Sequence, residues 1–398
     1  MTTMDMVICD KQWCTGCGAC INICQKDAIS FVADNEGFNY PEIKQDKCVN
    51  CGKCQRVCPQ NDVSGLEAFA MDKCFAVWNL DESIRKSSSS GGIFPALAEL
   101  FLNNGGVVCG ASFTDDYMKV HHIIIDNMDD IGLLQGSKYQ QSDPEYCYRS
   151  CKEKLNKGTP VLFTGTPCQV QGLYSYLGTK HELLWTVDIL CHGVPSTLVA
   201  NKYLQSVEDK YKSSIKKFSY RNKNIPEGWE NSCNIEILLE NGKQIDGRAE
   251  NLFFWKSFLS NIYLRKCCYH CEYAGKERIG DITIGDFWGI KNSIQEDLKN
   301  GISLVFVNSE KGKTLFDKAN IHKEIRNVSE ALPFNRTIKQ PFELSGDRDK
   351  FFSDLKKSGF RRAVFNQMPL KMIKWNITIF VRNIIGDSAY NAIKRRLK

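Results

Sequence analysis

Short apolar runs recur along the chain from residue 74 onward, and turn residues separate most of them. Apolar runs of about four to eight residues bounded by Gly, Pro or Asn are typical of buried strands. Ile93–Asn104 is longer, has apolar residues at helical spacing, and predicts a helix. The predicted strands are Phe75–Trp78, Gly106–Ala111, His121–Ile125, Val161–Thr164, Leu184–Cys191 and Asp281–Asp286. Strands that alternate with helices predict an α/β body with a mixed sheet.

The segment up to Asn61 has a different pattern, because two short strands lie between two copies of one cysteine motif. Ile29–Val32 and Gly37–Ile43 flank Asp34-Asn35-Glu36 and predict a hairpin. The motif C-x2-C-x2-C-x3-C occurs twice with identical spacing. Its members are Cys14, Cys17, Cys20 and Cys24, followed by Cys48, Cys51, Cys54 and Cys58.

Cysteines at this spacing are typical ligands of 4Fe–4S clusters, since a tight loop offers three soft thiolates to one cube. In two-cluster ferredoxins of bacterial type, the fourth cysteine of each motif ligates the other cluster. The expected sets are Cys14, Cys17 and Cys20 with Cys58, and Cys48, Cys51 and Cys54 with Cys24. Zinc sites do not explain the doubled set of eight, and disulfides suit secreted chains. The sequence therefore predicts an α+β ferredoxin-like two-cluster domain over residues 1–61.

Composition and charge argue against some classes of protein. The chain has 398 residues, 42% of them hydrophobic and 25% charged, as in ordinary globular proteins. The net charge of +6 is unevenly placed, because residues 348–398 hold a net +10. The rest of the chain is slightly acidic, which argues against a nucleic-acid-binding protein. Nineteen cysteines with no recognisable signal peptide predict a reducing cytoplasm, and no apolar run approaches the ~20 residues of a membrane span.

A second group of cysteines is spread over three later segments, each at an expected strand end or turn. The four cysteines of interest are Cys168, Cys191, Cys268 and Cys271. Together they are enough to ligate one further 4Fe–4S cluster. A single C-x2-C pair is also compatible with zinc, redox or structural roles, so the spacing alone leaves these alternatives open.

Residues 74 to 340 resemble the beta subunit of coenzyme F420 hydrogenases and dehydrogenases. The resemblance rests on Ser88–Gly92, Gly136–Tyr139, Gly165–Gly172, Cys268 with Cys271, and Asp281–Gly289. It implies an α/β mixed-sheet flavin and iron–sulfur domain that binds FAD and a third 4Fe–4S cluster. It also implies Cys168, Cys191, Cys268 and Cys271 as the ligands, although the neighbouring Cys267 is an alternative. Bacterial relatives with a fused ferredoxin are often found among polysaccharide-assembly genes.

Two segments are candidate flavin-binding residues. Ser89, Ser90, Gly91 and Gly92 precede the predicted helix, and small residues with free amides at a helix start form an anion site. A serine-rich linker with an ordinary N-cap is the alternative, and the resemblance favours the flavin. The other candidates are Gly136, Ser137, Lys138 and Thr166. Lys138 is expected to place a positive charge near the flavin ring.

Two further polar residues have both a functional and a structural interpretation. His192 follows a presumed ligand, so it is a candidate proton donor or a hydrogen-bonding neighbour of the cluster. A purely structural role is equally compatible with its position. Arg221 is a candidate for binding an anionic substrate, but a surface salt bridge is the expected role. Lys138 and His192 are the candidate catalytic residues.

The basic C-terminal segment predicts an amphipathic helix. After Pro369, apolar residues recur at helical spacing from Leu370 to Ile385, and Lys371, Lys374 and Arg382 lie off that stripe. Such a helix suits an anionic membrane surface or an acidic partner. Most helices of this pattern pack on their own domain, and that is our expectation here.

The predicted organisation has four parts. They are a ferredoxin-type domain at 1–61, the two halves of the family-like region at 74–150 and 151–340, and a basic helical tail at 341–398. The predicted function is an oxidoreductase in which electrons pass from ferredoxin-type clusters through a third cluster to FAD and a small molecule. That molecule is F420-like or an unsaturated metabolite. The alternative is a relay subunit that only hands electrons to another protein.

Overall fold

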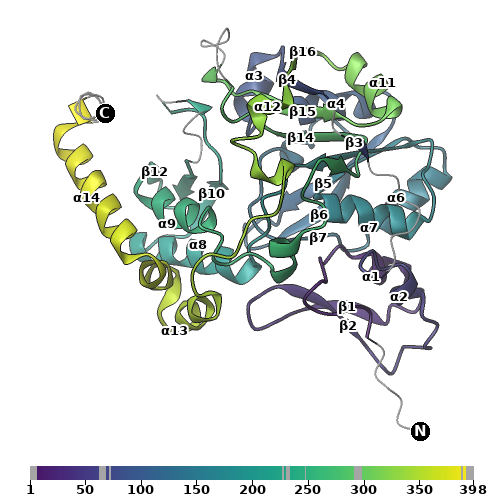
Figure 1. The fold of residues 1–398 in the computed structure, drawn as a ribbon, viewed down its shortest axis with the longest axis horizontal. Coiled ribbons are helices and arrows are strands. Elements are labelled where there is room, and N and C mark those ends of the chain that lie inside the picture. Colours follow the sequence, from purple (N-terminus) through teal and green to yellow (C-terminus); the bar gives the residue numbers. More distant parts are fainter. Residues whose placement is uncertain are drawn as a thin grey trace.

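A nine-stranded mixed sheet forms the centre of the molecule (Figure 1). The computed structural model describes residues 7–61, 69–70, 73–225, 228–229, 234–246, 248–290, 298–386 and 389–390. The strand order is β16-β4-β15-β14-β9-β8-β5-β6-β7. The strands are β4 Cys74–Asn79, β5 Val107–Phe113, β6 Val120–Ile125, β7 Ser142–Asp143, β8 Val161–Gly165, β9 Leu184–Ile189, β14 Ile282–Asp286, β15 Ser303–Val307 and β16 Ile321–Arg326. β5, β8, β9 and β14 run parallel, whereas β14–β15, β15–β4, β4–β16 and β5–β6 are antiparallel, which confirms the predicted mixed sheet.

Helices cover both faces of this sheet. Successive residues of a strand point to opposite faces, so one strand packs against helices on both sides. Val108 and Leu162 pack with α4 (Ile93–Leu102) and α11 (Glu310–Lys318). Their neighbours Val107, Cys109, Val161 and Phe163 pack instead with α6 (Cys147–Asn156) and α7 (Pro167–Leu177). Shorter elements at the margins of the sheet are α3 Glu82–Ser87, α5 Ile131–Leu134, α12 Val328–Ala331 and the strand pair β3 Phe69–Ala70 with β13 Glu277–Arg278.

The ferredoxin unit lies against α6 and α7. It contains the predicted hairpin, β1 Ile29–Ala33 paired antiparallel with β2 Asn39–Ile43, together with α1 Ala19–Ile23 and α2 Lys53–Arg56. Arg149 of α6 donates hydrogen bonds to the Asn22, Ile21 and Cys24 carbonyls and forms an ion pair with Asp27. The main body therefore holds the end of α1, where the chain reaches Cys24.

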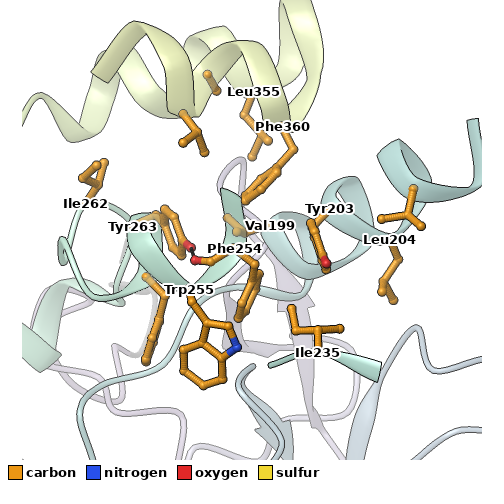
Figure 2. Close-up of a cluster of buried hydrophobic side chains, with 14 of the residues drawn as sticks. Val199, Tyr203, Leu204, Ile235, Phe254, Trp255, Ile262, Tyr263, Leu355 and Phe360 are labelled. Atoms are coloured by element: carbon orange, nitrogen blue, oxygen red, sulfur yellow. Dashed lines mark hydrogen bonds between the residues drawn. The ribbon is translucent and has the colours of Figure 1, made fainter. Parts of the chain in front are cut away.

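A second core joins the C-terminal region to the middle of the chain (Figure 2). It is formed by α8 Thr197–Tyr211, the strands β10 Ile215–Ser219, β11 Glu236–Leu239 and β12 Gln244–Asp246, α9 Arg248–Phe258 and α13 Arg348–Gln367. Leu355 and Phe360 of α13 are buried near Tyr203 and Tyr263. Residues 348–367, which we predicted as the first part of a basic helical tail over 341–398, are thus part of a packed core.

The last long helix, α14 (Pro369–Ile385), packs on its own domain as expected, but the predicted apolar stripe is not the side that docks. Among the described side chains of α14, Met372 and the half-buried Trp375 join the second core, whereas Leu370 and Phe380 are 81% and 65% exposed. In Figure 1 the helix runs along the outer edge of the molecule. Among the described residues, no helix is long and apolar enough to cross a membrane.

Candidate redox site

The structure gathers the four later cysteines around one small cavity. Cys168 lies in the first turn of α7, Cys191 follows β9, and Cys268 and Cys271 lie in and just after the 3₁₀ turn Lys266–His270. All four line a cavity of about 50 Å³. Thr166 caps α7 and its hydroxyl is 3.1 Å from the Cys168 sulfur, so the helix start fixes that thiol. Segments 100 residues apart in sequence thereby meet at a single point.

Burial raises the pKa of three of these thiols, those of Cys168, Cys191 and Cys271. It raises the pKa of Cys168 to about 12 and that of Cys271 to about 11, and neighbouring cysteines add to both shifts. Thiolates buried together repel one another, so a bound cationic centre stabilises their charged form. Among the described residues, no three His, Cys, Asp or Glu side chains are grouped as ligands of a single metal ion.

Cys267 lies in the same cavity wall and remains an alternative ligand. A hydrogen bond between the Cys267 and Cys268 thiols lowers the pKa of Cys268 and raises that of Cys267. Cys268 is therefore the member of the pair that loses its proton more easily.

A buried ion pair holds two of the cysteine loops together. Arg278 donates to Asp188 at 3.0 Å, and the two side chains are 1% and 0% exposed. The same guanidinium donates to the carbonyls of Ile189, which precedes Cys191, and Tyr273, which follows Cys271. Asp188 also accepts a hydrogen bond from the Gly280 backbone. One arginine thus fixes the spacing of both loops.

Arg278→Met is expected to destabilise the protein by about 3–5 kcal/mol, because it leaves Asp188 buried without its cation. Urea unfolding of the reconstituted protein gives the measurement. Arg278→Met combined with Asp188→Leu should recover most of that loss, since the unpaired charge is then gone. Lys313→Met, which breaks the exposed pair with Asp317, should cost less than about 1 kcal/mol. Equal effects of Arg278→Met and Lys313→Met would contradict the assignment.

The eight motif cysteines fall into an inner and an outer group. Cys14, Cys17, Cys20 and Cys58 are buried, and the last three influence one another electrostatically. In the other expected set, Cys54 is buried, Cys24 and Cys48 are half-buried, and Cys51 is exposed. The inner set faces the main body, and the outer set lies toward solvent.

The inner set adjoins the Cys168 site. Burial raises the pKa of Cys17 to about 12, and Cys58 and Cys168 contribute to the shift. The Tyr148 hydroxyl lies 2.6 Å from the Cys17 carbonyl and 2.8 Å from that of Gln169. A side chain at Gly172 of α7 would come within 3.0 Å of the Cys17 sulfur, so glycine permits this close approach.

Arg265 links the two cysteine regions from the opposite side. It is fully buried and donates to the Cys14 carbonyl at 2.7 Å and to the Asn39 carbonyl at 3.0 Å. Its guanidinium lies 4.1 Å from the centre of the Tyr40 ring. Because Arg265 precedes the 3₁₀ turn that carries Cys268, one buried cation contacts both domains. Sequence reasoning missed it, since these hydrogen-bond partners are more than 120 residues away in the chain.

A large cavity of about 710 Å³ opens on the other side of the Cys168 site. Both candidate flavin segments line it, and so do Thr166, Cys168, Cys191 and His192. The last four residues also line the small cavity, so the two spaces share a wall. The two flavin segments meet directly, because the Ser137 backbone donates to the Ser89 hydroxyl at 2.8 Å.

The glycines that were predicted to bind the flavin have different roles in the structure. Gly92 and Gly136 line the large cavity with φ values of +85° and +82°, which glycine adopts readily. Gly91 does not line it. A Cβ at Gly91 would come within 2.2 Å of the Val77 carbonyl, so this glycine permits close packing against β4 and β15. The Ser90 hydroxyl donates to the Ile302 carbonyl and anchors the same loop.

Lys138 is not a free charge beside the cavity. Its ammonium donates to the carbonyls of Leu133, Leu134 and Gln135 and so caps the end of α5. Burial lowers the pKa of Lys138 to about 7. Lys138 lines the large cavity, where its amine is bound to the end of α5, and its place near a flavin ring stays a prediction.

His192 is held between a hydrogen bond and an aromatic ring. Its Nε2 lies 2.6 Å from the Asn261 amide oxygen, and its ring stacks on Phe342 at 3.8 Å. Burial lowers the pKa of His192 to about 4, so the ring is neutral near pH 7. These contacts favour a positioning role beside Cys191.

The expectation of a surface salt bridge at Arg221 was wrong. Its side chain is 2% exposed, pairs with Asp286 at 2.9 Å and donates to the Tyr139 hydroxyl. Asp286 also accepts a hydrogen bond from Trp229, whose ring stacks on Trp288 at 4.7 Å. Arg221, Asp286 and Trp288 line the large cavity. In the sequence, the Gly285–Gly289 motif was the feature that could have indicated this part of the large cavity's wall.

Comparisons with known proteins identify the families of the two regions. Residues 74–144 match the N-terminal model of the family described as "Coenzyme F420 hydrogenase/dehydrogenase, beta subunit", and residues 158–331 match the C-terminal model of the same family. Residues 13–61 match a 4Fe-4S dicluster domain. The chain belongs to this beta-subunit family. The family resemblance inferred from the sequence motifs is thus confirmed, and the protein is an iron–sulfur member with a dicluster ferredoxin domain.

One solved structure similar to this family member is the F420-reducing [NiFe] hydrogenase complex from Methanosarcina barkeri. The match has 21% sequence identity and a TM-score of 0.43, and it covers 70% of this chain and 90% of that chain. No curated protein matches the sequence significantly.

Proposed function

We propose that this chain is an iron–sulfur flavoprotein oxidoreductase, which exchanges electrons with a redox partner and acts on a small molecule in the large cavity. The observation that carries the proposal is the shared wall of Cys168, Cys191 and their neighbours between the two cavities. Three bound 4Fe–4S clusters would supply one-electron steps, and FAD would combine them into a two-electron transfer.

The cysteine sets of the chain form a continuous series. The outer set contains the exposed Cys51, which a partner protein can approach. The inner set lies between the outer set and α7, and Cys168 at the start of α7 reaches the large cavity. Arg265 and Tyr148 hold the ferredoxin unit against the Cys168 site, so the separations in the series are fixed.

The large cavity suits a flavin and a substrate group. Its volume lies within the roughly 300–1,000 Å³ of cofactor and ligand pockets. Ser89, Ser137 and Thr166 offer polar groups for a dinucleotide, and Trp288 offers an apolar face. Arg221, held by Asp286, provides a buried cation in the wall for an anionic group.

We propose an F420-like deazaflavin or an unsaturated metabolite as the substrate, with polysaccharide biosynthesis as a context for the latter. Abundant free thiols favour a reducing cytoplasm. The alternative is a relay subunit of a larger dehydrogenase or reductase complex, which the beta-subunit family favours. A relay needs no substrate space beside the flavin, whereas the large cavity also extends to Phe334 and Arg336.

An acceptor screen separates the two functions. We expect dithionite-reduced protein to be reoxidised under anaerobic conditions by a small molecule without any partner protein. Deazaflavins, nicotinamides and unsaturated sugar or lipid-linked compounds are the compounds to test, and the flavin and cluster absorbances give the rates. Oxidation by partner proteins alone, across the whole screen, would replace the oxidoreductase with the relay.

A further inference from the structure

The exposed face of α14 is a continuous apolar stripe. It consists of Leu370, Ile373, Ile377, Phe380 and Ile384, each of them 47% exposed or more. These residues follow one another at intervals of three and four, which places them on one side of a helix. The stripe is about 20 Å long at the rise of an α-helix. Single apolar residues scattered over a surface are common, but an exposed apolar stripe of this length indicates a surface that binds a partner.

The stripe faces away from the rest of the molecule. α14 contacts its own domain through Met372, which is fully buried, and through Trp375, which lies beneath Lys256 of α9. At 100° per residue, both positions fall on the side of the helix opposite the stripe. The helix is therefore already anchored, and the described part of its own domain leaves the stripe exposed. Figure 1 shows the helix at the edge of the molecule.

The basic charge of α14 and of the residues around it indicates what binds the apolar stripe. The described basic residues of α14 are Lys371, Lys374 and Arg382, and the helix sequence contains no Asp or Glu. Residues 348–398 carry a net +10, whereas the remainder of the chain is slightly acidic. Two copies of the helix would bring only positive charges together, which disfavours a coiled-coil dimer. A basic helix with Leu, Ile and Phe on one face fits an anionic bilayer surface.

We propose that α14 binds the surface of a bilayer containing anionic phospholipids and holds the large redox domain beside it. The apolar stripe would enter the boundary between headgroups and acyl chains, and Lys374, which borders the stripe, would remain among the headgroups. This inference does not depend on the identity of the cofactors or of the substrate. It concerns a helix that lies on the bilayer, since no described helix is able to cross it.

Cosedimentation of the full chain with vesicles tests the proposal. We expect binding to phosphatidylcholine vesicles in which about one lipid in four is phosphatidylglycerol, and at least tenfold weaker binding to pure phosphatidylcholine. Raising the salt from about 0.05 M to about 0.5 M should weaken binding to the anionic vesicles by a similar factor. No pelleting with the anionic vesicles would overturn the proposal.

The double variant Ile377→Gln with Phe380→Gln should reduce binding at least tenfold. Both side chains are exposed, so its melting temperature and iron content should match those of the parent chain. Leu80→Gln with Leu344→Gln removes two other exposed apolar side chains and should bind like the parent. Equal binding by the two double variants would overturn the proposal. So would a dimer in analytical ultracentrifugation that the α14 variant abolishes, because the occupant would then be a second copy.

Discussion

Cys168→Ser is expected to remove one cluster, so that the iron content falls from about twelve to about eight per chain after anaerobic reconstitution. Cys168 is the only cysteine on α7, and the start of that helix places its thiol in the wall shared by the two cavities. A serine hydroxyl is a poor ligand for iron in a cluster compared with a thiolate. Because both ferredoxin motifs are untouched, their paramagnetic resonance signals should persist after reduction.

Cys74→Ser is the matched control for this variant. Cys74 is fully buried, but it lies in β4, where its thiol donates to the Arg326 carbonyl. A hydroxyl can make the same contact, so this variant should keep all of its iron. A third variant, Cys267→Ser, tests which of the two adjacent cysteines is the ligand. Because the pKa of Cys268 is lowered, we expect Cys268 to be the ligand and Cys267→Ser to retain about twelve irons. Eight irons in the fully loaded parent chain would show that there is no third cluster.

The strands could be predicted from the sequence because each is a short apolar run between turn residues. β8 and β9 were placed within a few residues, and the ferredoxin hairpin was found at Ile29–Ala33 and Asn39–Ile43. These features depend on local periodicity, which a single sequence displays. The order of the strands in the sheet depends on non-local contacts, and the sequence does not display it.

The sequence indicated which residues belong to the candidate site, but it did not indicate which other residues they contact. Arg221 was expected at the surface, because nothing local indicates that Asp286 lies beside it. Lys138 was expected to place a charge near the flavin, and its binding to the carbonyls of the residues just before it was not foreseen. A helix C-terminus accepts cations, so the short helix Ile131–Leu134 was the missing information.

The tail illustrates a further limit of sequence reasoning. Helical spacing identified the apolar residues of α14, but an amphipathic pattern does not say whether its apolar face points inward. Met372 and Trp375, on the other side of the helix, are the residues that dock. Two anchoring residues among many exposed ones were enough to reverse the expected orientation.

Ser89→Phe is expected to lower the FAD content of the purified protein at least tenfold, if the large cavity holds the flavin. Ser89 lines that cavity, and its hydroxyl accepts the Ser137 backbone hydrogen bond that joins the two candidate segments. A phenyl group there occupies cavity volume and removes the acceptor. Flavin released by acid precipitation and measured by its absorbance gives the result.

The choice of Ser89 follows from the position of its neighbour Gly91. Gly91→Val would bring a side chain onto the Val77 carbonyl, so loss of flavin from that variant would report disruption of the sheet and not of the cavity. Ser87→Phe is the matched control, since Ser87 is exposed and does not line the cavity. Both serine variants should keep the parent melting temperature and iron content. If Ser89→Phe then retains as much flavin as Ser87→Phe, the flavin binds elsewhere, and the large cavity is left as a substrate site alone.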